Sequence, residues 1–81
     1  MTQEEFYHRM RLFFQGRRPD LAAEIAPDTQ LWEAGYLDSF GLIEAIVLLE
    51  ELTGRPFTVG ADDLPSFFTL QGMYTAFVAT S

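Results

Sequence analysis

The 81-residue chain has no cysteine and no lysine, and its five basic residues are all arginines. Without cysteine, neither a disulfide framework nor a thiolate metal site can form, and any thiol chemistry must use an imported thiol. A single histidine adds little support for a metal site, and we expect none. Twelve acidic residues give a net charge of −7. This excess disfavours nucleic acids and anionic lipids as partners and favours basic proteins.

The chain also lacks a long apolar run and a recognisable targeting segment. It begins Met-Thr-Gln-Glu-Glu, not with a basic stretch followed by an apolar one. Residues 64–81 are uncharged, but they include Pro65 and Gly72 and are fewer than the roughly 20 apolar residues that a membrane span needs. We therefore expect a cytoplasmic protein with no membrane contact.

What is present is the composition of a small globular protein. Hydrophobic residues make up 48% and aromatic residues 15%, enough for a core without covalent staples. A mass of 9.2 kDa leaves room for one domain, residues 1–81. The charge is uneven, because after residue 18 ten acidic residues stand against Arg55 alone. We expect the later segments to carry a negative field that steers partners.

Helical periodicity predicts an all-α fold with three main helices and one short helix. The expected elements are a helix over residues 3–15, a helix over residues 39–53, a short turn over residues 62–67 and a final helix capped by Thr69. No β-hairpin signal interrupts this pattern.

Local signals bound the first helix and describe the connection that follows it. Thr2 and Glu5 form a capping box, and Gly16 is expected to end the helix. Residues 17–38 contain prolines and glycines and predict a long connection, with a short helical stretch near residues 20–25. We expect Trp32 to hold this loop on the core. Connections of this length are often functional.

The helix expected over residues 39–53 has two apolar faces. The positions predicted to face the core are Leu42, Ala45, Ile46, Leu49 and Leu52. The opposite side carries a second stripe, Phe40, Ile43 and Val47, flanked by Glu44, Glu50 and Glu51. Either this stripe meets a partner, or the helix is buried on nearly all sides. The first interpretation is favoured, because so short a chain has little mass to bury a whole helix and glutamates resist burial.

The segment leading into this helix resembles the acyl carrier protein and peptidyl carrier protein family. The residues at matching spacing are Leu31, Gly35, Leu37, Asp38, Ser39, Phe40, Leu49, Glu50, Glu51, Phe67, Thr69 and Leu70. The resemblance covers most of the chain and implies a small four-helix carrier bundle with a long first loop. It departs at Gly41, where many relatives carry an acidic residue, and at Phe40, where leucine is common. These departures affect the choice of partner, not the modification.

The resemblance implies a covalent cofactor and a set of partners. In that family a transferase attaches phosphopantetheine to the serine hydroxyl, so Ser39 is the implied attachment site and Asp38 the implied recognition residue. The implied partner-binding residues are Phe40, Ile43, Glu44, Val47, Glu50 and Glu51. The implied partners are the phosphopantetheinyl transferase and acyl-loading, condensing or tailoring enzymes with basic docking patches. Such a protein is a monomer and catalyses nothing, so no catalytic residue is expected.

Physical chemistry supports the same serine, although a simpler interpretation exists. A phosphodiester at a helix N-terminus meets free backbone N–H groups and the positive end of the helix dipole. However, a serine in this position is often only an N-cap.

Three functions remain open at this stage: a carrier, a hydrolase and an unmodified adaptor. The starting Met suggests a discrete carrier, either for acyl groups in polyketide, fatty-acid or other specialised metabolism, or for an amino acid as in stand-alone D-alanyl-type carriers. A hydrolase would use Ser39 as nucleophile with His8 and Asp38, but no nucleophile-elbow motif is present. An unmodified helical adaptor would bind a basic amphipathic peptide in an acidic groove.

Overall fold

The computed structural model describes residues 1–21 and 24–79, which form helices and loops without a strand. Its elements are α1 (Gln3–Arg17), α2 (Ser39–Thr53), the 3₁₀ helix η1 (Ala61–Phe67), α3 (Leu70–Met73) and the π-helical turn η2 (Tyr74–Val78). Because η2 continues α3 directly, the two together form the final helix. The predicted all-α bundle of three main helices and one short helix is confirmed.

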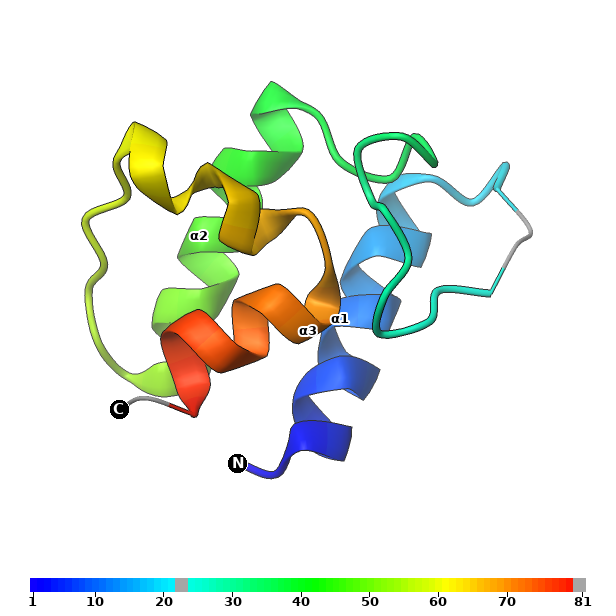
Figure 1. The fold of residues 1–81 in the computed structure, drawn as a ribbon. Helices are drawn as coiled ribbons and strands as arrows, with labels where there is room; N and C mark the ends of the chain where they lie inside the picture. Colours follow the sequence, from blue (N-terminus) through cyan, green and yellow to red (C-terminus); the bar gives the residue numbers. More distant parts are fainter. Residues whose placement is uncertain (22–23, 80–81) are drawn as a thin grey trace.

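The two long helices run side by side in opposite directions, so the end of α1 lies beside the beginning of α2 (Figure 1). In the same view α3 and η2 lie between the other ends of α1 and α2. One hydrophobic cluster joins all the elements. Its fully buried large side chains are Phe6, Met10, Phe14, Ile25, Leu31, Leu49, Phe67, Leu70 and Met73.

The first helix begins as predicted but ends later. The Thr2 hydroxyl accepts a hydrogen bond from the Glu5 N–H at 3.2 Å. The predicted end at Gly16 is wrong, because the helix continues to Arg17 and Arg18 follows as its C-cap. Gly16 does not adopt the positive φ with which a glycine ends a helix. The extra residue places Arg17 on the helix, next to the start of α2.

The long connection between α1 and α2 is joined by backbone hydrogen bonds to the end of η1 and to α3. The Leu31 N–H donates to the Phe68 carbonyl at 2.9 Å, and the Gln71 N–H donates to the Pro27 carbonyl at 3.0 Å. These bonds join residues distant in sequence. They hold the segment that leads to α2 in a defined position.

Trp32 is half-buried and packs against the core cluster, as predicted. The short helical stretch expected near residues 20–25 includes residues 22–23, which lie outside the described part of the chain. The described residues on either side of them are not helical.

The second helix has the predicted bounds, Ser39–Thr53. Ala45 and Leu49 are buried, and the other three residues of the predicted core stripe are partly buried against the same cluster. Gly54 ends the helix with a φ of 71°, the left-handed conformation that favours glycine.

The final helix is capped as predicted and approaches η1 closely. The Thr69 hydroxyl accepts a hydrogen bond from the Gly72 N–H at 2.9 Å. A Cβ added to Gly72 would lie 2.8 Å from the Ser66 carbonyl oxygen. The glycine therefore allows η1 and α3 to pack at this distance.

Candidate functional site at the start of the second helix

Asp38, not Ser39, caps the second helix. The Asp38 Oδ1 accepts a hydrogen bond from the Gly41 N–H at 2.7 Å, so the interpretation of Ser39 as an N-cap is wrong. Ser39 is the first residue of α2 and is exposed. Its hydroxyl has no hydrogen-bond partner within the part of the chain that the structure describes. The side chain is thus accessible to a modifying enzyme.

The backbone around Ser39 suits a phosphate group. The Gly41 and Leu42 N–H groups bond to Asp38, through its carboxylate and its carbonyl respectively. The N–H groups of Ser39 and Phe40 have no acceptor within the helix. They point toward the helix start, where the dipole attracts negative charge, and the first turn of α2 contains no acidic side chain.

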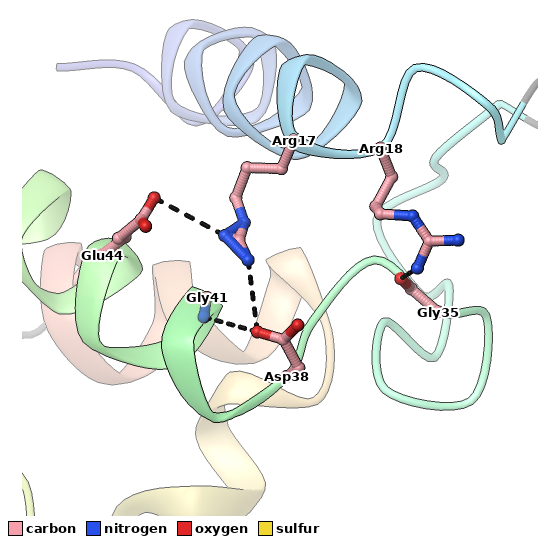
Figure 2. Close-up of polar contacts among 6 residues, drawn as sticks. All are labelled: Arg17, Arg18, Gly35, Asp38, Gly41 and Glu44. Atoms are coloured by element: carbon pink, nitrogen blue, oxygen red, sulfur yellow. Dashed lines mark hydrogen bonds and ion pairs between the residues drawn. The ribbon is translucent and has the colours of Figure 1, made fainter.

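An arginine from the first helix bridges two carboxylates at this site, which the sequence did not predict (Figure 2). The Arg17 Nη2 lies 3.2 Å from the Asp38 Oδ1, and its Nη1 lies 3.5 Å from the Glu44 Oε2. We call this arrangement the Arg17 bridge. Helical periodicity shows only that several arginines lie near the end of α1; it does not show which one reaches α2.

The neighbouring arginine fixes the loop before the helix. Arg18 donates to the Gly35 carbonyl at 2.8 Å and pairs with the Asp20 carboxylate at 2.9 Å. The hydrogen bond between Arg18 and the Asp20 carboxylate lowers the pKa of Asp20 and raises the pKa of Arg18. Gly35 has a φ of 90°, which favours glycine at this turn. Together these contacts position the segment that ends at Asp38.

The second apolar stripe, formed by Phe40, Ile43 and Val47, is in contact with solvent. The side chains are 76%, 62% and 48% exposed, respectively. The interpretation of α2 as a helix buried on nearly all sides is therefore wrong. We call these three residues the apolar stripe. Such a stripe on a small protein is typical of an interaction surface.

A groove of about 350 Å³ lies along the apolar stripe, between α1 and α2. Its lining residues are Phe13, Ile43, Glu44, Val47, Leu48 and Glu51. Apolar side chains and two carboxylates therefore meet in one surface feature.

The three glutamates of α2 have different surroundings. Glu44 belongs to the Arg17 bridge, and Glu51 is exposed and has no hydrogen bond or ion pair with any residue that the structure describes. Glu50 is half-buried and accepts a hydrogen bond from the Phe57 N–H at 2.9 Å. Glu50 thus binds the backbone of the loop that follows α2, and no local sequence pattern predicts this contact.

The structure does not bring His8 to Ser39. Arg17, whose side chain reaches Asp38, lies nine residues after His8 on α1, or about 13 Å along the axis. This spacing also places the two side chains on opposite faces of the helix. The serine–histidine pair that a hydrolase would need is therefore not formed.

One comparison with known proteins identifies a relative. The chain is 34% identical over 55 residues to acyl carrier protein 2 of Ralstonia nicotianae, and the match covers 68% of each protein. The chain belongs to the acyl carrier protein family. No family model matches the chain, and no solved structure matches it.

Family membership establishes the general role. Acyl carrier proteins are carriers and not enzymes, and this chain is likewise a carrier and not an enzyme. Proteins of this family carry phosphopantetheine and act together with phosphopantetheinyl transferases and biosynthetic enzymes. Among residues 1–21 and 24–79 of this carrier, no helix has the length and hydropathy that crossing a membrane requires.

Proposed function

We propose that Ser39 is the attachment site for phosphopantetheine and that the protein presents an acyl group to successive enzymes. When attached, phosphopantetheine supplies a terminal thiol that holds the acyl group as a thioester. The observation that supports this most directly is the exposed Ser39 hydroxyl, which has no hydrogen bond within the described residues. In a member of this family, an available hydroxyl at the start of a helix is the expected acceptor.

The residues around Ser39 have separate tasks in this proposal. Asp38 caps the helix through its side chain, which leaves the serine hydroxyl available. The N–H groups of Ser39 and Phe40 and the helix dipole stabilise the phosphodiester. The loop contacts of Arg18 keep the segment before Asp38 in place, so the hydroxyl is presented in a constant orientation.

The apolar stripe and the nearby carboxylates form the proposed docking surface. Phe40, Ile43 and Val47 fix the orientation of a partner, while Glu44 and Glu51 attract its basic residues. The proposed partners are the phosphopantetheinyl transferase and acyl-loading, condensing or tailoring enzymes with basic patches. Small interfaces suit a protein that must dissociate from each partner in turn. Glu50 contributes less, because it is engaged by Phe57.

We propose an acyl cargo in preference to an aminoacyl cargo. The relative's name, acyl carrier protein 2, supports this choice. Polyketide or other specialised metabolism remains our prediction for the pathway.

A mass measurement tests the attachment site. The purified protein is incubated with coenzyme A, magnesium and a broad-specificity phosphopantetheinyl transferase, and the intact mass is measured. We expect the gain of one phosphopantetheinyl group, and no gain for Ser39→Ala.

Ser66→Ala is the matched control, because it removes a described serine hydroxyl outside the site. This variant must be modified like the unaltered chain. An unmodified wild-type chain, or a Ser39→Ala chain that still gains mass, would show that the proposed function is wrong.

A further inference from the structure

The Arg17 bridge lies at the start of the proposed docking surface. The Arg17 side chain is only 20% exposed, and its Nε is buried without a hydrogen-bond partner among the described residues. Its Cζ lies 6.0 Å from the centre of the Phe13 ring. The Arg17 side chain extends from α1 toward the start of α2, so the guanidinium lies between the two helices (Figure 2).

Gly41 makes room for this arginine. A Cβ added to Gly41 would lie 3.1 Å from the Arg17 Cζ and 3.3 Å from its Nε, closer than ordinary van der Waals contact. Gly41 is buried although it lies in the first turn of a surface helix. A Cβ at this position would also lie 3.2 Å from the Asp38 Oδ1, so both partners of the ion pair would have to shift by a few tenths of an ångström.

The bridge changes the charge available to a partner. Asp38 and Glu44 share the cation of Arg17, and Glu50 is engaged by the Phe57 N–H. Of these carboxylates and Glu51, only Glu51 has no partner within the described residues. The start of α2 is thus less negative than its sequence indicates.

We propose that Arg17 is a specificity-determining residue, which competes with the basic residues of partner enzymes for Asp38 and Glu44. This inference rests on the proposed function, because it assumes that enzymes dock on α2. The Asp38 and Glu44 side chains are 70% and 55% exposed, so a partner can reach both carboxylates, but its basic residues must compete there with the Arg17 cation. Enzymes with weakly basic patches are therefore rejected, while strongly basic ones bind. Gly41 acts through Arg17, since its lack of a side chain keeps the bridge in place.

The test is the KM of the phosphopantetheinyl transferase for the carrier at low ionic strength. We expect Arg17→Met to lower this KM about two- to fivefold, the range of a partly exposed ion pair. Methionine retains apolar contact with Phe13 but releases both carboxylates. A merely structural arginine would give the opposite result, because its loss would raise the KM or leave it unchanged.

Arg9→Met is the matched control. Arg9 lies exposed on the same helix, and the described residues offer it no hydrogen bond or ion pair. This variant removes the same charge without releasing a carboxylate, so its KM should change by less than about twofold. An equal effect of the two variants would show that only the net charge matters, and the proposal would be wrong.

Two further variants keep the test decisive. Glu44→Gln should raise the KM more in the Arg17→Met background than in the unaltered chain, because only the former has a free Glu44 carboxylate. Arg17→Gln also removes the cation from both carboxylates and should lower the KM by a similar factor, so the test stands if Arg17→Met folds poorly. A constant effect of Glu44→Gln in both backgrounds would overturn the proposal. If the unaltered chain is not modified at all, the proposed function itself fails.

Discussion

Asp38 combines two tasks that can be separated by substitution. Its Oδ1 caps α2 through the Gly41 N–H and also faces the Arg17 guanidinium. A hydrogen bond at a helix cap needs only an acceptor oxygen, whereas the ion pair needs a negative charge. Asparagine supplies the acceptor oxygen without the negative charge. The residue implied to guide the transferase is therefore also one that shapes the helix.

We expect Asp38→Ala to lower the free energy of unfolding by about 1 kcal/mol and Asp38→Asn to lower it much less. The reason is that asparagine retains the cap, while the exposed ion pair contributes little to stability. Urea denaturation monitored by circular dichroism measures both changes. Equal losses for the two variants would show that the charge, not the cap, stabilises the start of α2.

At the scale of elements, two helical glycines have opposite packing constraints. Gly72 faces the Ser66 carbonyl oxygen, 2.8 Å from where a Cβ would lie, whereas nothing lies within 4 Å of a Cβ at Gly16. Both residues lie in helical segments. Replacing glycine with alanine stabilises a helix by up to about 1 kcal/mol, so packing decides whether each substitution stabilises or destabilises the protein.

Gly72→Ala should therefore destabilise the protein by about 1–3 kcal/mol, because η1 and α3 must move apart. Gly16→Ala should stabilise it by up to about 1 kcal/mol. Thermal and urea denaturation of the two variants side by side test this pair. A stabilising Gly72→Ala would mean that η1 shifts without cost.

Local patterns predicted the elements better than their contacts. The bounds of α2, the Thr69 cap and the exposure of the apolar stripe follow from periodicity and capping, which act within a few residues. The end of α1 was placed too early, because a glycine stops a helix only when it adopts a left-handed conformation.

The contacts of Arg17 and Glu50 could not be predicted in this way. Arg17 pairs with Asp38, 21 positions later, and Glu50 binds the backbone of Phe57 across the turn that ends α2. Such pairings depend on how elements pack together, and no single segment encodes them. Ser39 is predicted as the attachment site through the family resemblance, and that stays a prediction, whereas the assignment of the helix cap to Ser39 instead of Asp38 was wrong.

At the scale of the whole molecule, α2 carries core residues on one side and the proposed docking surface on another. Leu49 is 1% exposed and belongs to the core, whereas Ile43 is 62% exposed and belongs to the apolar stripe. Both residues lie on one helix, six positions apart, so their side chains point about 120° apart around its axis. One side of α2 holds the core together, and the other carries the surface that we propose for docking.

Leu49→Ala should lower the free energy of unfolding by about 2–5 kcal/mol. Ile43→Ala should change it by less than about 0.5 kcal/mol but raise the transferase KM. Denaturation and steady-state kinetics on the same preparations test both statements. A large stability loss for Ile43→Ala would place that side chain in the core instead of the docking surface.

The exposed stripe also affects how the protein behaves when concentrated. Phe40, Ile43 and Val47 are exposed to solvent in the isolated protein. Association of two copies through these residues would bury apolar surface and lower the free energy. The net charge of −7 keeps copies apart, and salt screens that repulsion. Low protein and salt concentrations therefore favour separate molecules, whereas high concentrations of both promote self-association through the residues that we propose for docking.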